Sequence, residues 1–201
     1  MDKIKTVIFD IGGVLINIDS NVFPRQLGIE RNRVSHVDEQ AIERIAKEYE
    51  IGHIGTEDFF GMMNEIFKGK YAREKLEKAW NATVLEENSA IIPIVDEILV
   101  SYQTAILSNT SPAHFQRSLD TAAILKKFSR LYLSFRIGAA KPDPAVYEYV
   151  IHDLAAEPSS LLFIDDLPEN VAAAVKCGME GIVFKNVSGL YSELRLRKIC
   201  K

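Results

Sequence analysis

Two short apolar segments, far apart in the chain, each stop at acidic side chains. The segment 6–9 stops at Asp10, and the segment 161–164 stops at Asp165 and Asp166. Carboxylates that crowd together cannot all remain ionised unless a cation joins them, and ligands that offer only oxygen suit a hard ion. Mg2+ is such an ion, and it can bridge carboxylates to a phosphate group. If the fold brings these three side chains together, they predict a Mg2+ site for a phosphorylated ligand.

Three further polar residues could serve the same chemistry. Ser108 and Asn109 follow the apolar segment 104–107, and Lys141 lies in a loop. We expect them to bind the substrate, because a phosphate dianion needs positive charge and hydrogen-bond donors. With its charge screened by a metal, Asp10 could attack phosphorus and form an aspartyl-phosphate, which splits one difficult displacement into two easier ones. Considered singly, each residue is more typical of a turn, a helix cap or the surface; their combination favours a site.

Strands and helices alternate from residue 89 onward. The segments 104–107, 131–135, 161–166 and 181–184 are typical of strands. Helices are predicted at about 90–101, after the pairs Ser111–Pro112 and Asp143–Pro144, and at 168–177. This alternation predicts an α/β fold, a Rossmann-like three-layer core with a parallel sheet. Ligands of such sheets bind beyond the carboxyl ends of the strands, so the polar residues above should meet at one edge.

Residues 17–88 differ in character from the rest of the chain. They show helical periods separated by glycine turns and almost no strand-like alternation. Helices are predicted at about 32–49, from an N-cap at Thr56 onward, and at about 72–84. We therefore expect a small α-helical cap domain, 17–88, inserted after the first strand into a catalytic core formed by 1–16 and 89–201. The aromatic and methionine stripe of the middle helix is expected to form the core of this cap rather than a ligand pocket.

Bulk properties disfavour several classes of function. The 201 residues carry a net charge of -4, with Lys and Arg scattered among acids, so nucleic acid and anionic membranes are not expected partners. No apolar stretch approaches the length of a signal peptide or a membrane span. The two cysteines, Cys177 and Cys200, form no Cys-x-x-Cys pair and are expected to be free thiols. We expect a cytoplasmic protein, either a monomer or a weak homodimer.

The order and spacing of these motifs resemble the haloacid dehalogenase superfamily, in its phosphatase branch with a helical cap. Asp10 is similar to the nucleophile of that family, Ser108 to its second motif, Lys141 to its third, and Asp165–Asp166 to its fourth. The resemblance implies that Asp10, the Gly12 carbonyl and Asp166 hold Mg2+. It implies that Asp165 is either a further ligand or a residue that contacts a ligand. Details such as Asn17-Ile18-Asp19 and Ser108-Asn109-Thr110 are similar to bacterial sugar-phosphate phosphatases of the glucose 1-phosphate type.

One position departs from that family. Its phosphatases usually carry a second Asp two residues after the nucleophile, as acid and base, and here that position is Gly12. Losing such a group typically costs ~10²–10⁴-fold in rate, a small part of the total enhancement of phosphate ester hydrolysis. A residue of the cap domain or Asp19 could substitute for it, and His53 and His114 could also approach the site. A turn, helix-cap or surface role is the more typical one for Asp19 and for each histidine.

Three other functions are compatible with parts of the pattern. A 2-haloacid dehalogenase also lacks the second Asp, but it needs no metal, and the pair Asp165–Asp166 would disfavour a carboxylate substrate. A phosphomutase would need the acid and base that Gly12 removes. A non-catalytic protein could bind a phosphorylated ligand or a partner on the same fold, although binding alone gains nothing from Asp10. We therefore expect a Mg2+-dependent phosphatase of small phosphorylated metabolites, with sugar phosphates as the favoured substrates.

Overall fold

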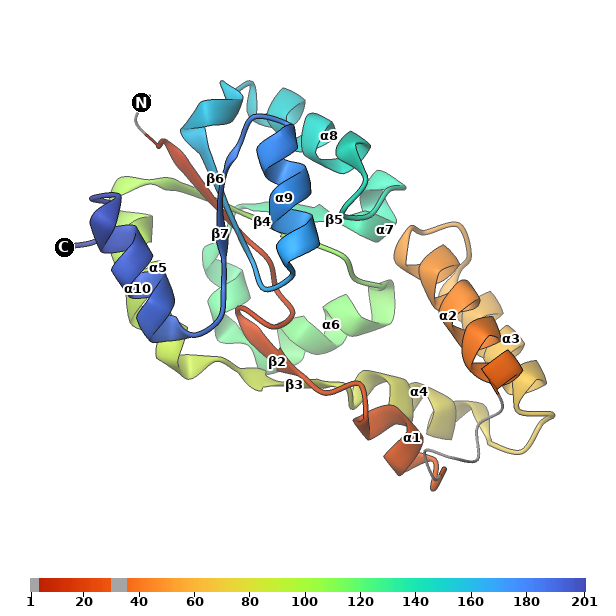
Figure 1. Ribbon diagram of the computed structural model, residues 1–201. Coiled ribbons are helices and arrows are strands. Elements are labelled where there is room, and N and C mark those ends of the chain that lie inside the picture. The colour runs from red at the N-terminus through yellow and green to blue at the C-terminus, as the bar shows by residue number, and fades with distance from the viewer. Residues whose placement is uncertain (1–3, 30–35) are drawn as a thin grey trace.

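Five parallel strands form the centre of the molecule in the order β5-β4-β1-β6-β7 (Figure 1). The computed structural model describes the backbone of residues 4–29 and 36–201, and side chains from residue 39 onward in the second range. The strands are β1 (Thr6–Phe9), β4 (Gln103–Ser108), β5 (Arg130–Leu133), β6 (Leu161–Asp165) and β7 (Glu180–Val183). The predicted α/β fold with a parallel sheet is confirmed, and β1, buried along its whole length, lies in the middle.

Helices cover both faces of this sheet because successive strand residues point to opposite sides. Val7 and Phe9 belong to one apolar cluster, and Ile8 belongs to another. The first cluster includes residues of α5 (Ile92–Ser101), α6 (Pro112–Thr121) and α10 (Val187–Leu196). The second includes residues of α8 (Pro144–Leu154) and α9 (Pro168–Lys176). The predicted three-layer arrangement follows from these two clusters.

Two helix starts agree with the predicted caps. The Ser111 hydroxyl accepts a hydrogen bond from the His114 backbone N–H before α6, and the Asp143 carboxylate accepts one from the Ala145 N–H before α8. Each cap is followed by proline, whose missing N–H costs nothing in the first turn. Shorter helical segments are α7 (Ser134–Ile137), η1 (Ser89–Ile91), η2 (Ala123–Lys127) and η3 (Pro158–Ser160).

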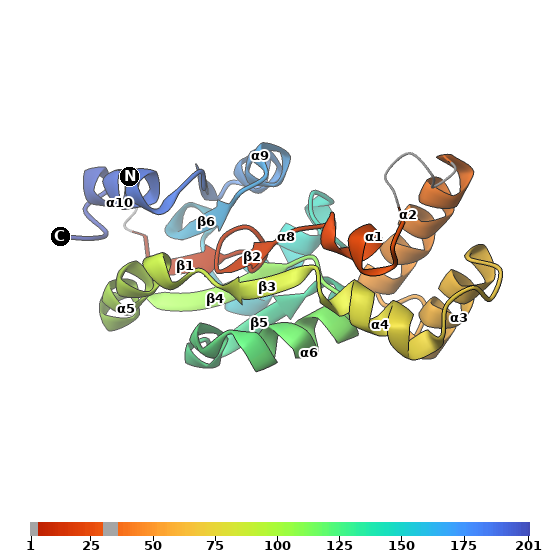
Figure 2. The same ribbon diagram turned by 90° about the horizontal axis from the view of Figure 1, so that it is seen from below.

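Four helices gather at one end of the molecule, away from both termini (Figure 2). They are α1 (Val22–Gln26), α2 (His36–Glu50), α3 (Thr56–Ile66) and α4 (Arg73–Asn81). They enclose an apolar cluster of their own, in which Phe59, Phe60 and Met63 are fully buried and Tyr49 stacks on Phe59. The aromatic and methionine stripe is thus confirmed as core. The division of the chain at residues 17 and 88 stays a prediction.

The inserted segment also contains strand structure that was not expected. Strands β2 (Ile16–Ile18) and β3 (Val84–Glu87) pair with each other in antiparallel orientation. The helix predicted over 72–84 is therefore wrong at its end, because α4 stops at Asn81 and Val84 opens a strand. Strands of three and four residues are too short for alternation to be recognised, and each is completed by a partner far away in the sequence.

Two smaller predictions are wrong at one residue or boundary, and a third lies partly outside the residues that the structure describes. Gly55 is the N-cap of α3, so the Thr56 cap is wrong; the Thr56 hydroxyl hydrogen-bonds the Tyr49 hydroxyl instead. The strand predicted over 131–135 ends at Leu133, where α7 begins. Of the helix predicted over 32–49, residues 32–35 lie outside the described residues, and α2 runs from His36 to Glu50.

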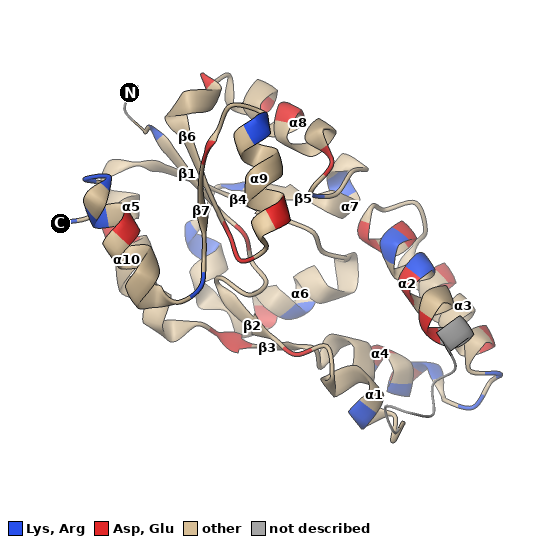
Figure 3. Ribbon diagram, viewed as in Figure 1, with Lys and Arg blue, Asp and Glu red and all other residues tan. Residues whose placement is uncertain are grey.

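Lys and Arg are interspersed with Asp and Glu over the elements (Figure 3). Cys177 and Cys200 are both free, as expected. Among the described residues, no helix combines the length and apolar character needed to span a bilayer.

Candidate active site

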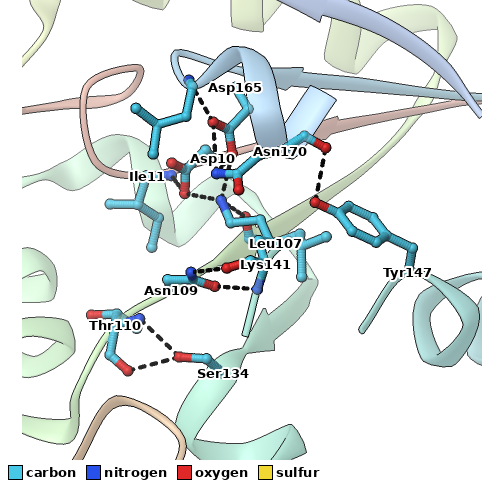
Figure 4. Close-up of polar contacts among 11 residues, drawn as sticks. Asp10, Ile11, Leu107, Asn109, Thr110, Ser134, Lys141, Tyr147, Asp165 and Asn170 are labelled. Carbon is cyan, nitrogen blue, oxygen red and sulfur yellow. Dashed lines mark hydrogen bonds and ion pairs between the residues drawn. The ribbon is translucent and has the colours of Figure 1, made fainter. Parts of the chain in front are cut away.

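Four of the polar residues singled out in the sequence, Asp10, Asn109, Lys141 and Asp165, meet at the carboxyl edge of the sheet (Figure 4). Ser108 ends β4 and Asp166 follows β6 at the same edge. Strand β1 lies between β4 and β6, with Phe9 in register with Ile106 and Ile164. Asp10 follows Phe9 directly, so its side chain emerges between the ends of the two neighbouring strands. Because the three strands are parallel, their ends and the groups on them share one edge.

Lys141 joins two of the carboxylates. Its ammonium nitrogen lies 2.9 Å from Oδ1 of Asp10 and 2.6 Å from Oδ2 of Asp165, and it donates to the Leu107 carbonyl at 3.1 Å. An ammonium group has three donors, so all of them are engaged. The Lys141 side chain is 1% exposed. Two ion pairs and one hydrogen bond hold the Lys141 ammonium group in the interior. Lys141 is therefore not the surface residue that lysine typically is.

Asn109 holds the backbone of Lys141. Its side-chain oxygen accepts from the Lys141 N–H and its side-chain nitrogen donates to the Lys141 carbonyl, both at 2.8 Å. The amide of Asn109 is therefore used to fix the loop that carries the lysine. Ser108 is buried beside it at the end of β4, 3% exposed.

Asp165 is fully buried and surrounded by donors. Its Oδ1 accepts from the Leu167 backbone N–H at 2.8 Å, and the Asn170 side-chain nitrogen lies 3.1 Å from both of its oxygens. Tyr147 in turn donates its hydroxyl to the Asn170 carbonyl at 2.9 Å. These contacts orient Asp165 toward Lys141 and compensate for the burial of its charge.

Asp10, Asp165 and Asp166 form a group that suits a hard cation. One carboxylate oxygen from each lies within 4.8 Å of the others. Burial raises the pKa of Asp10 to about 6 against the opposing effect of Lys141, and burial, with the nearby charge of Asp165, raises the pKa of Asp166. One ammonium does not neutralise three carboxylates, so the donor set and its charge fit Mg2+.

Gly13 is required beside this group. Its φ is +74°, in the region that favours glycine, and a Cβ there would lie 2.4 Å from Oδ2 of Asp166. Any side chain at position 13 would therefore displace the Asp166 carboxylate. The Gly12 carbonyl is a metal ligand only by the resemblance stated above, and that assignment stays a prediction.

A cavity of about 270 Å³ adjoins these strand ends, between the core loops and the α1–α4 group. Its wall is mostly apolar, with a few hydroxyl and amide groups and two ionisable side chains, Glu50 and His114. The lining residues are Ile11, Gly12, Ile16, Ile18, Ser20, Phe23, Glu50, Trp80, Thr83, Val84, Ser108, Asn109, Thr110, His114 and Ser118. A larger open depression of about 930 Å³ lies at the opposite edge of the sheet, where Thr6 and Gln103 begin β1 and β4. None of the three carboxylates lines either hollow, but Ile11 and Gly12, which follow Asp10, line the smaller one.

Of the residues considered as substitutes for the second Asp, only His114 lines the cavity. Asp19 accepts from the backbone and side chain of Asn21 and pairs with Arg25, and the Asn21 hydrogen bonds lower its pKa. It therefore has the role of a turn residue before α1. His53 is exposed and pairs with Glu48 at 2.8 Å.

His114 is buried in neutral form. Its ring stacks on Trp80 with centroids 4.7 Å apart, and its Nε2 lies 3.0 Å from the Trp80 carbonyl, to which it must donate. Burial lowers the pKa of His114 to about 4, against the opposing effect of that hydrogen bond. The ring is therefore uncharged at neutral pH.

We expect this burial to make the protein less stable in acid. Because the pKa of His114 is lowered from 6.5 to about 4 on folding, the unfolded chain binds a proton that the folded chain rejects between these values. Stability is complete above pH 6.5 and falls as the pH drops toward 4, by about 2 kcal/mol between pH 7 and pH 5 from this residue. Urea unfolding of the wild type and of His114→Gln at both pH values measures the difference, because Gln can keep the bond to Trp80 and cannot titrate. Equal losses in the two proteins would contradict the assignment.

Two residues near the cavity received no role from the sequence. Ser134 fell inside a predicted strand, and Glu50 lay one residue beyond a predicted helix. Glu50 is the last residue of α2, and an acid is disfavoured at that end of a helix dipole. This local conflict was the one signal available in the sequence.

Comparison with known proteins agrees with this geometry. A family model described as haloacid dehalogenase-like hydrolase matches residues 4–178. A D-ribitol-5-phosphate phosphatase from Bacteroides thetaiotaomicron is 26% identical over 200 residues, 95% of this chain and 97% of the relative. The crystal structure of a haloacid dehalogenase family enzyme from the same organism matches with a TM-score of 0.86 at 23% identity, covering 94% of this chain and 99% of that one. The complex of that enzyme with magnesium and inorganic phosphate matches with a TM-score of 0.79 at 24% identity. The match covers 94% of this chain and 99% of that one.

Proposed function

The chain belongs to the haloacid dehalogenase-like hydrolases, and from that premise we propose that it is a Mg2+-dependent phosphatase of small phosphorylated metabolites. The observation that carries the proposal is the contact of Lys141 with Asp10 at 2.9 Å, inside a group of three carboxylates. A phosphatase is the activity named for a relative that aligns with nearly the whole chain.

In the proposed reaction Asp10 is the nucleophile. Its carboxylate attacks phosphorus, the ester oxygen leaves, and water then releases phosphate from the aspartyl-phosphate. Lys141 holds Asp10 in position and offers positive charge to the phosphate oxygens, and Ser108 offers a hydroxyl. Asp10, Asp166 and the Gly12 carbonyl would hold Mg2+, with Asp165 as a further ligand or as a residue that contacts a ligand. The ion would neutralise the charge that gathers during the transfer. Asn109 acts on the substrate chiefly through the loop of Lys141 that it fixes.

The segment 17–88 is proposed as the cap domain that selects the substrate. Its residues Phe23, Glu50 and Trp80 line the cavity together with core residues. At about 270 Å³ the cavity lies at the small end of ligand pockets, which typically hold ~300–1,000 Å³. Such a volume favours the phosphate ester of a small alcohol, and a sugar or polyol phosphate agrees with the relative that acts on D-ribitol 5-phosphate. We propose that the protein works in the cytoplasm as a monomer or weak homodimer, in keeping with its free thiols.

The test is hydrolysis of a panel of phosphate esters with and without metal. We expect release of phosphate from p-nitrophenyl phosphate and from several sugar and polyol phosphates, at higher kcat/KM than from nucleotides. EDTA should abolish the activity and added Mg2+ should restore it, because three carboxylates around one lysine need a further cation. Inorganic phosphate release measures each rate.

Other results would support other functions. Tight binding of phosphate without turnover of any ester would favour a non-catalytic protein that binds a phosphorylated ligand or a partner. Metal-independent release of halide from 2-haloacids would favour a dehalogenase. The crowding of Asp165 and Asp166 beside Asp10 argues against the dehalogenase, because a carboxylate substrate would be repelled there.

A further inference from the structure

Hydrolysis of a phosphate ester needs a proton donor and a proton acceptor. The leaving oxygen of an alkyl ester must receive a proton, and the attacking water must lose one. Of the residues that line the cavity, two have ionisable side chains, Glu50 and His114. The question is which of them can exchange a proton with a ligand in the cavity.

His114 is poorly suited to this exchange. Its Nε2 proton is held by the Trp80 carbonyl at 3.0 Å, and its ring is packed flat against Trp80. The ring is neutral, because burial lowers the pKa of His114 to about 4. A proton transfer from Nε2 would break a buried hydrogen bond and leave a carbonyl unpaired.

The core side of the cavity offers no acid at position 12. A Cβ on Gly12 would lie 2.5 Å from Cδ1 of Ile18, so the space beside the nucleophile's loop is filled by an apolar side chain. Ile18 and Gly12 both line the cavity. A proton donor must therefore come from another part of the wall.

Glu50 lies at the end of α2, which hydrogen-bonds the core at two adjacent residues. The Tyr49 hydroxyl accepts from the Ala113 N–H at 3.2 Å, at the start of α6. The Ser134 hydroxyl donates to the Glu50 carbonyl at 2.5 Å and accepts from the Thr110 N–H at 2.9 Å, two residues from Ser108. These contacts place the end of α2 against the loop that follows β4.

The backbone that follows Glu50 also lies close to the core. Gly52 has a φ of +75°, and a Cβ there would lie 2.3 Å from the Phe135 carbonyl oxygen. A side chain at position 52 would push α2 away from α7. Three contacts with the core, at Tyr49, Glu50 and Gly52, therefore fix the position of Glu50. A reacting group needs such a fixed position before the reaction begins.

The Glu50 carboxylate is available for proton transfer. Within the described part of the chain it has no hydrogen-bond or ion-pair partner, although the residue is half-buried. Burial raises the pKa of Glu50, against the opposing charge of Lys47. Lys47, on the same helix, is the charged group that acts on Glu50, and the neutral His114 is the other ionisable side chain that lines the cavity. A raised pKa favours the protonated carboxyl, which is the form that can donate a proton to a leaving group.

We propose that Glu50, from the inserted segment, is the acid and base of the phosphatase reaction, an inference that rests on the proposed function. As Asp10 bonds to phosphorus and the bond to the ester oxygen breaks, that oxygen takes the proton of the Glu50 carboxyl and leaves as an alcohol. A water molecule then enters, Glu50 takes one of its protons, and the hydroxyl oxygen bonds to phosphorus. The bond between phosphorus and Asp10 breaks, which regenerates the Asp10 carboxylate and a protonated Glu50.

The test compares Glu50→Gln with the wild type on two kinds of ester. For the best sugar or polyol phosphate of the panel, kcat/KM should fall ~10²–10⁴-fold, because an alkoxide leaves poorly without a proton. For p-nitrophenyl phosphate, kcat/KM should change little, because p-nitrophenolate leaves as a stable anion. Its kcat should fall, and rapid mixing should show a burst of p-nitrophenol, because water can no longer lose its proton readily and the aspartyl-phosphate accumulates.

Glu48→Gln is the matched control, because Glu48 lies on the same helix, has a side chain that is 47% exposed and pairs with His53. We expect it to behave as the wild type on both esters. An equal fall of kcat/KM on both esters in Glu50→Gln would indicate a structural role and overturn the proposal, and so would an unchanged rate on the alkyl ester. A wild-type protein without any phosphatase activity would instead contradict the proposed function itself, and the role of Glu50 with it.

Discussion

Asp10→Asn is expected to lose about 10⁶-fold in kcat on every phosphate ester that the wild type hydrolyses. A neutral amide oxygen is a far weaker nucleophile than a carboxylate, so the covalent step is lost. The shape of the side chain is preserved, and the amide oxygen can still accept from the Ile11 N–H, a bond of 2.7 Å in the wild type. Lys141 keeps its bonds to Asp165 and to the Leu107 carbonyl. Steady-state kinetics measure the loss, and thermal unfolding verifies that the variant is folded.

Asp19→Asn is a suitable control for this experiment. It makes the same chemical change nine residues further along the chain, at a carboxylate that is occupied by Asn21 and Arg25 and does not line the cavity. We expect its activity to stay within a few-fold of the wild type. If Asp10→Asn retained a rate comparable to that of Asp19→Asn, covalent catalysis by Asp10 would be refuted.

Lys141→Met is expected to lower the free energy of unfolding by about 3–5 kcal/mol, in addition to abolishing activity. The substitution removes the ammonium group that contacts Asp165, whose side chain is 0% exposed, and Asp10, whose side chain is 10% exposed. A buried carboxylate without its partner must either remain charged in an apolar setting or take up a proton, and both cost stability. Urea unfolding at pH 7 in the absence of metal measures the effect.

Two further variants separate this effect from the general loss of a lysine. Lys127 pairs with Asp96 at the surface, where both side chains are at least 40% exposed, so Lys127→Met should cost less than about 1 kcal/mol. Adding Asp165→Asn to Lys141→Met should recover part of the lost stability, because the amide needs no counter-charge. A loss in Lys141→Met no greater than in Lys127→Met would show that the buried pair contributes little to the fold.

Much of the core could be predicted from local sequence because its signals are local. The segment Thr6–Phe9 is apolar throughout and is buried on both faces of the sheet, as expected of a central parallel strand. The caps at Ser111 and Asp143 act within three residues of the helices they begin. Strands β2 and β3 could not be predicted, because Ile18 pairs with Val84 and neither segment is long enough to show a period of its own.

The sequence by itself determined which acidic groups stand at the strand ends, and therefore the grouping of Asp10, Asp165 and Asp166. Parallel strands place their carboxyl ends at one edge, and this is a consequence of chain direction alone. The tertiary structure decided that the Asn109 amide is used on the Lys141 backbone and that Glu50 lies beside the cavity. These relations depend on contacts such as that between Ser134 and Glu50, which are 84 residues apart. No local pattern encodes such a contact, because the two residues meet only after the chain has folded.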